Sequence, residues 1–306
     1  MRVAAIDIGS VTTRLMIAEV SQGVVRELYR ELAITDLGKG LAATGKLDRE
    51  GIERVFEAVQ RFTVSIAKHD VEVCACVATS ATRDASNSDR LVARLQSCGI
   101  DIRIIDGNQE AALSFAGATY GAPRGANVLV VDPGGGSTEL TWGMVPTLGG
   151  SVSVDVGSRR LTDMFIHTDP PTQDELEGCR RYIETSIQTR FHRQGGFPLT
   201  DTTTIMAVAG TATTMATVMM GIDSYDPSNV HGFQVSREDI SAILTRFCEV
   251  DEIGRAQIPG LEPKRAPMII AGILIIEAIF EITGVTRLTI SDHDLLYGIM
   301  LEAARR

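Results

Sequence analysis

The 306-residue chain contains one local pattern twice. In each copy an apolar run ends in Asp-x-Gly, two hydroxyl residues begin three positions after the glycine, and a second apolar run follows. The copies occupy residues 6–15 and 131–140, with Asp7 and Asp132 at equivalent places. Apolar runs joined by such a segment predict a strand, a tight turn and a second strand. The repetition therefore favours a chain of two similarly built domains.

Apolar spacing along the rest of each half predicts further strands that alternate with helices, which is typical of an α/β fold. Gly121 to Gly125 is rich in turn residues and marks a boundary. We expect domains at 1–122 and 123–292 that flank a cleft, with a final helix over 293–306 packed back on the first domain. The strands expected in the first third are 3–8, 14–20, 24–35, 71–79 and 102–105, and helices are expected to follow Asp48, Ser236, Glu262 and Asp294.

The charge balance excludes several classes of partner. Lys and Arg number 29 against 39 Asp and Glu, a formal charge of −10. So acidic a chain is not expected to bind a nucleic-acid polymer or an anionic membrane surface. The longest apolar stretch, near 268–276, is too short to span a bilayer. Five cysteines without a C-x-x-C pair suit a reducing compartment, so we expect a cytoplasmic protein without a signal peptide.

The two Asp-x-Gly segments have the chemistry of a phosphate site. Glycines permit positive φ and close backbone approach, so the Gly134, Gly135 and Gly136 amides could turn toward one anion. Asp7 and Asp132 would repel phosphate unless Mg²⁺ (or Mn²⁺) lies between. A hairpin with an Asx turn is the alternative for either segment alone. The remaining candidate phosphate contacts here are Gly9, Ser10, Thr12, Thr13 and Ser137.

A third glycine segment follows a predicted strand and opens a predicted helix. Gly210 and Thr211 lie at that junction. Helix N-termini bind anions through their free N–H groups. An ordinary strand-to-helix turn explains the segment equally well.

Several short motifs, taken in order, resemble the exopolyphosphatase/guanosine pentaphosphate phosphohydrolase (Ppx/GppA) family of the actin-like ATPase and sugar-kinase superfamily. The resemblance covers essentially the whole chain and implies two actin-like (ribonuclease H-like) domains, in the short form that lacks a C-terminal helical domain. Val11, Pro133 and Pro267 depart from the family's usual residues. The motifs are DIGSVTTRL at 7–15, LGKGL at 37–41, ATSATRDASN at 78–87, IDGNQEA at 105–111, DPGGGSTEL at 132–140, VHG at 230–232 and SDH at 291–293.

The resemblance also implies residue roles. Glu110 matches the family's general base, although a glutamate favoured by a helix dipole is the alternative. Glu139 would orient the attacking water or bind metal, unless it is a strand surface charge. Arg83 would contact phosphate in the bidentate way open to arginine, unless it merely pairs with Asp84. Arg265 matches an arginine of the family near the apolar helix.

The resemblance implies an enzyme that releases terminal orthophosphate from inorganic polyphosphate by metal-assisted attack of water, and a homodimer. Guanosine pentaphosphate is the alternative substrate. A polyphosphate or nucleotide kinase and a non-catalytic phosphate-chain sensor are the more distant alternatives.

Overall fold

The computed structural model describes residues 1–192, 199–200, 202–222 and 225–305. The chain divides into two compact units, one of Met1–Tyr120 with Asp294–Arg306 and one of Gly121–His293. The boundary expected from sequence, at 122/123, lies two residues further along. Within the described residues no helix is long and apolar enough to cross a membrane.

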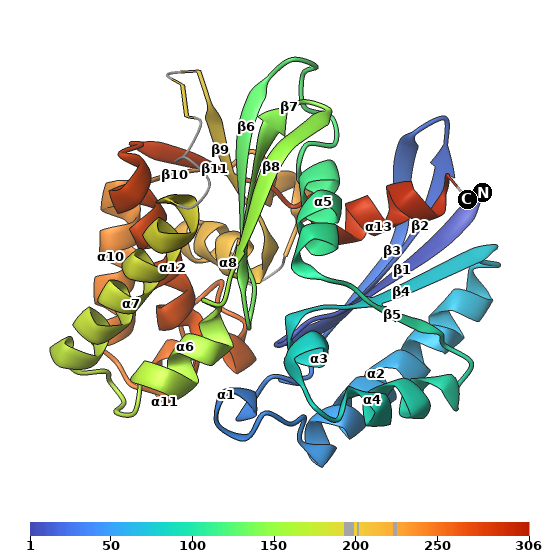
Figure 1. Cartoon of the computed structure of the whole chain (residues 1–306), viewed down its shortest axis with the longest axis horizontal. Coiled ribbons are helices and arrows are strands. Elements are labelled where there is room, and N and C mark those ends of the chain that lie inside the picture. Colours follow the sequence, from blue (N-terminus) through green and yellow to red (C-terminus); the bar gives the residue numbers. More distant parts are fainter. Residues whose placement is uncertain (193–198, 201, 223–224, 306) are drawn as a thin grey trace. The chain divides into compact units, whose positions relative to one another are not determined.

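The first unit is built on a five-stranded sheet in the order β3-β2-β1-β4-β5. β1, β2 and β3 form an antiparallel meander, and β4 and β5 run parallel to β1. Helices α2 and α4 cover one face and α5 and α13 the other (Figure 1). The elements are β1 (Arg2–Ile8), β2 (Thr12–Ser21), β3 (Val24–Ile34), α1 (Leu41–Thr44), α2 (Arg49–Lys68), β4 (Val73–Ala78), α3 (Ser80–Asp84), α4 (Ser88–Gln96), β5 (Ile102–Ile104), α5 (Gly107–Ala118) and α13 (Leu295–Ala303).

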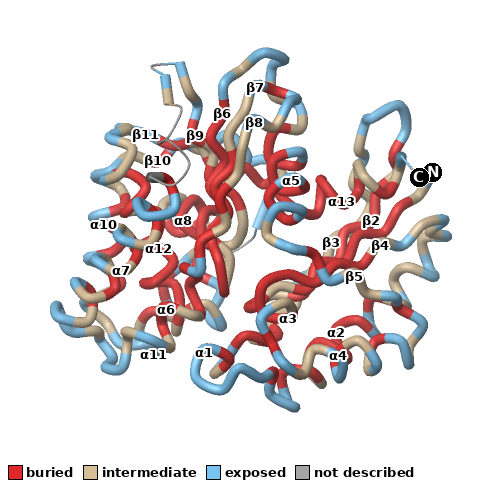
Figure 2. Tube along the Cα trace, viewed as in Figure 1, coloured by how far each residue is buried: buried red, intermediate tan, exposed pale blue. Residues whose placement is uncertain are grey.

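Side chains of β1 alternate between two apolar layers. Ile6 and Ile8 pack in the α2 and α4 layer, whereas Val3 and Ala5 pack in the α5 and α13 layer. A strand buried on both faces reads as the continuous apolar run seen in the sequence. In β1 every residue after Arg2 is buried, and the strand is drawn mostly in red in Figure 2.

Helix α13 joins the first unit by an unusually close crossing with α5. A Cβ on Gly117 would lie 1.8 Å from the Asp294 carbonyl oxygen, and one on Gly298 would lie 2.0 Å from that of Leu113. Only glycine permits this approach. The last segment of the chain therefore returns to the first unit, although unit 2 intervenes in the sequence.

The second unit is built on a six-stranded sheet in the order β10-β11-β9-β6-β7-β8. β6, β7 and β8 repeat the antiparallel meander, and β9 runs parallel to β6 as β4 does to β1. The elements are β6 (Asn127–Pro133), β7 (Thr138–Met144), β8 (Thr147–Val154), α6 (Ser158–Phe165), α7 (Gln173–His192), β9 (Thr204–Ala207), α8 (Ala209–Met220), α9 (Pro227–Val230), β10 (Gln234–Ser236), α10 (Arg237–Cys248), α11 (Glu252–Arg255), η1 (Pro263–Arg265), α12 (Ile269–Thr283) and β11 (Arg287–Ile290).

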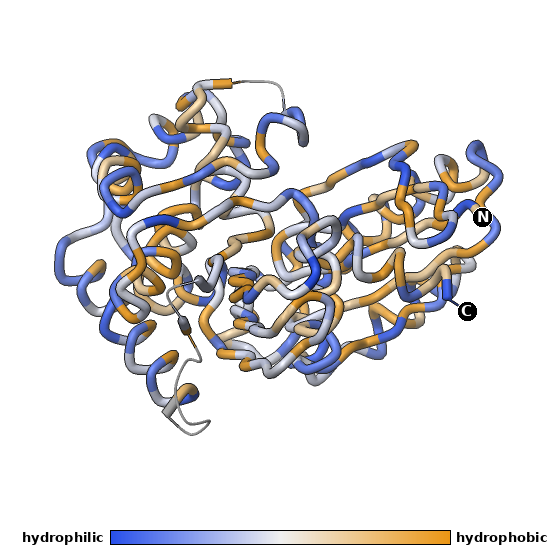
Figure 3. The backbone as a smooth tube through the Cα atoms, turned by 90° about the horizontal axis from the view of Figure 1, so that it is seen from above, coloured by the Kyte–Doolittle hydropathy of each residue, from blue (hydrophilic) through white to orange (hydrophobic). Residues whose placement is uncertain are grey.

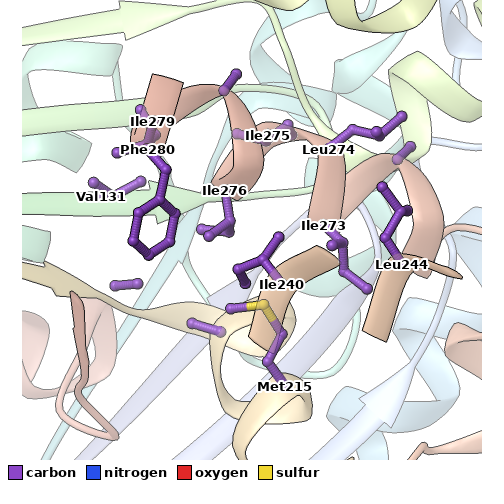
Figure 4. Close-up of a cluster of buried hydrophobic side chains, with 14 of the residues drawn as sticks. Val131, Met215, Ile240, Leu244, Ile273, Leu274, Ile275, Ile276, Ile279 and Phe280 are labelled. Atoms are coloured by element: carbon purple, nitrogen blue, oxygen red, sulfur yellow. The ribbon is translucent and has the colours of Figure 1, made fainter. Parts of the chain in front are cut away.

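Helix α12 is the centre of the core of the second unit. Its side chains from Ile269 to Ile276 are buried on every side, which explains why no helical periodicity marks it in the sequence. Figure 4 shows Ile273 and Ile276 on the side of α12 toward Ile240 of α10, with Met215 of α8 next to Ile240, and all of them belong to one cluster. Hydrophilic residues instead gather on outer helices and loops, coloured blue in Figure 3.

The internal repeat is confirmed at the level of strand register. Asp7 pairs with Arg14 across β1 and β2, and Asp132 pairs with Glu139 across β6 and β7. The α/β class predicted from sequence is likewise confirmed by both sheets.

One local expectation was wrong, and one strand was not predicted. The helix expected to follow Glu262 begins only at Ile269, because a short 3-10 turn over Pro263–Arg265 comes first. The strand β10 (Gln234–Ser236) was not anticipated, since three residues carry no measurable periodicity.

Candidate active site

The two Asp-x-Gly turns are closed by the same hydrogen bond. In the first unit the Gly9 N–H donates to the Thr12 carbonyl at 2.8 Å, and in the second the Gly134 N–H donates to the Ser137 carbonyl at 2.9 Å. Each turn places its aspartate at the end of a buried strand, where Asp7 is 4% and Asp132 is 8% exposed. The repeat therefore produces two equivalent acidic turns, one in each unit.

The glycines of these turns use close backbone approach and not positive φ. None of Gly9, Gly134, Gly135 and Gly136 has a positive φ among the described residues. The glycines act through lack of a side chain, since a Cβ on Gly134 would lie 3.0 Å from the Ser137 carbonyl oxygen. The amides consequently owe their direction to contacts of the neighbouring carbonyls and not to left-handed backbone.

Asp7 lies in a buried charge triad. The Arg14 guanidinium donates to Asp7 Oδ2 through Nε at 3.0 Å and through Nη2 at 2.6 Å, and its Nη1 donates to Asp294. Burial raises the pKa of the Asp7 carboxyl above its ordinary value, and Arg14 opposes that rise. Asp7 Oδ1 is buried without a hydrogen-bond partner in the described part of the chain, so it keeps an acceptor for a ligand.

Glu110 and Arg83 meet in the first unit. Glu110 lies in the first turn of α5 behind the capping box of Asp106 and Gln109, and it is 7% exposed. Arg83 Nη1 donates to Glu110 Oε2 at 3.0 Å and to the Ile105 carbonyl at 3.1 Å. The pair with Asp84 considered from sequence is longer, at 3.9 Å. An adjacent guanidinium stabilises an ionised carboxylate, the form that a general base needs.

Glu139 is the matching carboxylate of the second unit. It is 1% exposed on β7 and accepts a hydrogen bond from Ser153 Oγ at 2.7 Å. This burial rules out the strand-surface charge considered as its alternative. Arg14 occupies the equivalent position of the first unit. Equivalent positions of the two repeats therefore carry opposite charges.

The hydroxyl residues that were predicted to contact phosphate differ in how far they are buried. Ser10 Oγ lies 2.9 Å from Ser80 Oγ, and Thr13 Oγ1 lies 3.0 Å from Thr35 Oγ1, all buried. Ser137 is also buried, whereas Thr12 is half-buried. The Thr13 hydroxyl is therefore hydrogen-bonded inside the first unit. A phosphate contact by any of these residues stays a prediction.

The third glycine segment packs tightly at the start of α8. A Cβ on Gly210 would lie within 2.3 Å of three guanidinium atoms of Arg265, so this arginine covers the glycine. Thr211 is 4% exposed, and its Oγ1 lies 2.6 Å from where a Cβ on Gly272 would stand. The structure brings Arg265 to this segment but places the Thr211 side chain in a helix contact with α12.

Sequence reasoning missed the partners of the predicted residues. Asp294 was interpreted only as the start of a helix. In the structure it accepts a hydrogen bond from Arg14, 280 positions away in the sequence, and so completes the triad. Ser153 lies on β8 outside the motifs, so nothing in the sequence marked it as the partner of Glu139. Asp294, next to the SDH motif, had the only usable signal, a charged residue directly before a buried helix.

The two sheets, each with an acidic turn after its first strand and parallel strands beyond, define an α/β protein of the actin-like class. The sequence profile of the Ppx/GppA phosphatase family matches residues 16–306, and the chain belongs to that family. The resemblance inferred from the motifs, and with it the expectation of an enzyme, is confirmed.

Three similar proteins illustrate the relationship. Exopolyphosphatase 2 of Mycobacterium tuberculosis is 35% identical, covering 99% of this chain and 98% of the relative. The crystal structure of the Aquifex aeolicus Ppx/GppA family member superposes with a TM-score of 0.82 at 31% identity, over 100% of this chain and 98% of that one. An exopolyphosphatase structure from Cytophaga hutchinsonii gives 0.89 at 26% identity, over 99% and 98%.

Proposed function

We propose that this chain is an exopolyphosphatase that releases terminal orthophosphate from inorganic polyphosphate. The observation that carries the proposal is the buried Glu110 carboxylate held by Arg83 at 3.0 Å, at the motif position of a phosphatase family. Relatives named exopolyphosphatase that match nearly the whole chain support polyphosphate as the substrate.

Glu110 is proposed as the general base. A carboxylate accepts a proton from water as that water attacks the terminal phosphorus, and the anhydride oxygen leaves with the shortened chain. Arg83 donates to the Glu110 carboxylate and offers further N–H donors to phosphate oxygens. Glu139, which accepts a hydrogen bond from Ser153 Oγ, is proposed to orient the attacking water or to bind the metal.

The residues present fit a divalent cation. Mg²⁺ prefers oxygen ligands and usually takes one or two carboxylates with several waters, so it needs no dense protein cluster. The unpartnered Asp7 Oδ1 meets that need, and Asp132 is its equivalent in the other repeat. When bound, the cation would neutralise the charge of the phosphate oxygens. Phosphate release is expected to stop in EDTA and to return with Mg²⁺ or Mn²⁺.

The test replaces Glu110 by Gln, which keeps the side-chain size and removes the base. We expect phosphate release to fall at least about 100-fold, the lower range for a general base, while polyphosphate binding remains. Glu57→Gln, an exposed glutamate on α2, is the matched control and should release phosphate normally. Near-normal release by Glu110→Gln would show that Glu110 is not the general base.

Side-by-side substrates test the reaction class. Polyphosphate should release orthophosphate faster than guanosine pentaphosphate does. Faster release from the nucleotide would favour the pentaphosphatase alternative, ATP formation from ADP would indicate a kinase, and tight binding without turnover would indicate a sensor.

A further inference from the structure

Helix α6 binds three successive carbonyls of the glycine turn in the second unit. The Ser158 N–H donates to the Gly134 carbonyl at 2.9 Å, and the Arg159 and Arg160 N–H groups donate to the Gly135 carbonyl at 2.9 and 3.0 Å. The third carbonyl, that of Gly136, accepts from the Arg160 side chain, whose Nε lies 2.8 Å away. A side chain therefore completes a row that backbone amides begin.

These contacts fix the direction of the turn's amides. In a trans peptide the carbonyl and the following N–H point in opposite directions. Because the Gly134, Gly135 and Gly136 carbonyls point at the first turn of α6, the N–H groups of Gly135, Gly136 and Ser137 point away from it. The row of carbonyl contacts thus presents three successive donors on one side without a positive φ.

In the first unit, backbone amides alone donate to the two equivalent carbonyls. The Gly38 N–H donates to the Ser10 carbonyl at 2.8 Å, and the Thr35 and Asp36 N–H groups both donate to the Val11 carbonyl at 2.9 Å. Ser10 and Val11 are the repeat equivalents of Gly135 and Gly136. Where the first unit uses backbone amides on the last carbonyl, the second unit uses Arg160.

The close approach of α6 depends on one glycine. A Cβ on Gly157 would lie 2.4 Å from the Gly136 carbonyl carbon and 2.5 Å from that of Gly135. Helix α6 therefore begins against the turn itself, which brings the half-buried Arg160 within reach of Gly136.

We infer that Arg160 is a positioning residue for phosphate binding: its Nε–H holds the Gly136 carbonyl and thereby aims the Ser137 N–H, with those of Gly135 and Gly136, at phosphate oxygens of the substrate. The inference rests on the proposed function, because it assigns this turn to the phosphate chain. Nε donates to a neutral carbonyl, so we expect an uncharged N–H donor of the same reach to hold the Gly136 carbonyl as well.

Two substitutions of equal reach separate donor from charge. Arg160→Gln places an amide nitrogen the same number of bonds from the backbone as Nε, so it can donate to the Gly136 carbonyl without charge. Arg160→Met places a methyl group there. Both remove one positive charge, and Arg181→Met, at an exposed position on α7, is the control for that loss.

Tripolyphosphate binding is measured by calorimetry in the Glu110→Gln background, where turnover does not interfere. We expect Arg160→Met to weaken binding at least about tenfold, the share of one charge-assisted or well-oriented hydrogen bond, and Arg160→Gln and Arg181→Met to stay within about threefold of the parent. In the active chain the Met variant should raise KM for polyphosphate more than it lowers kcat.

The ¹⁵N–¹H NMR spectrum of the glycine amides distinguishes a positioning role from a merely structural one. With ¹⁵N-labelled glycine, tripolyphosphate should shift the Gly135 and Gly136 amide signals in the parent and in Arg160→Gln, and shift them much less in Arg160→Met. The inference is overturned if Arg160→Met binds as the parent does, or if Arg160→Gln is as weak as Arg160→Met. Failure of wild type to release orthophosphate, with this binding pattern intact, would instead overturn the proposed function alone.

Discussion

Replacing Arg14 by Met should destabilise the chain strongly, because it leaves two buried carboxylates without their shared cation. The Arg14 side chain is 16% exposed, and those of Asp7 and Asp294 are 5% and 8% exposed. Methionine keeps the apolar stem length but supplies no donor. Asp7 and Asp294 would then face each other with neither solvent nor a guanidinium to offset their charge.

The expected cost follows from that burial. Breaking a buried ion pair by removing one partner costs about 3–5 kcal/mol, and the partial exposure of Arg14 favours the lower end, about 3 kcal/mol. In urea, with a slope of about 2 kcal/mol per molar, this loss lowers the unfolding midpoint by about 1.5 M.

The assay is urea unfolding at pH 7 followed by far-ultraviolet circular dichroism. Arg26→Met is the matched control, since it removes the same side chain from an ion pair with Glu19 in the same meander, where the two side chains are 68% and 41% exposed. Exposed pairs contribute about 0–1 kcal/mol, so the control midpoint should move by less than about 0.5 M. Equal shifts for the two variants would refute the assignment of a buried triad.

Two further outcomes follow from the described contacts. Gly157→Ala should lower stability by at least about 1–3 kcal/mol and weaken tripolyphosphate binding, because its Cβ would overlap the Gly135 and Gly136 carbonyl carbons; Gly178→Ala, whose Cβ would meet only Phe165 at 3.7 Å, is the control in the same urea titration. Burial raises the pKa of the Cys179 thiol to about 12 from its ordinary 9.0, so the folded chain keeps it neutral while the unfolded chain ionises it. This contribution to stability is complete below pH 9 and declines as pH rises from 9 toward 12; iodoacetamide at pH 9 should leave Cys179 unmodified in the native chain and alkylate it in urea, as read by peptide mass spectrometry, and rapid native alkylation would contradict the burial.

Much of the fold was predictable because local rules decide it. The repeat of Asp-x-Gly segments predicted a strand, a tight turn and a second strand in each half. The observed registers, Asp7 with Arg14 and Asp132 with Glu139, follow from the turn length. Helix α12 was harder to delimit, since a helix buried on all sides has no periodicity and its start depends on the preceding 3-10 turn.

The site was predictable residue by residue but not contact by contact. The motifs pointed to Glu110 and Arg83, yet nothing in the sequence joined Arg14 to Asp294, because that contact depends on the α5 and α13 crossing at Gly117 and Gly298. Likewise the glycine triplet suggested that its amides could turn toward one anion, but it did not indicate the carbonyl contacts with α6 that direct them. Long-range packing, which no local pattern encodes, decides both.

The most direct test of the central claim is a time course of chain-end-labelled polyphosphate with the wild-type chain and Mg²⁺, resolved by gel and by orthophosphate assay. We expect orthophosphate to appear from the first time point as the chain shortens one residue at a time, and Glu110→Gln to leave the polymer intact. Polymer fragments formed without orthophosphate, or equal release by Glu110→Gln, would contradict it.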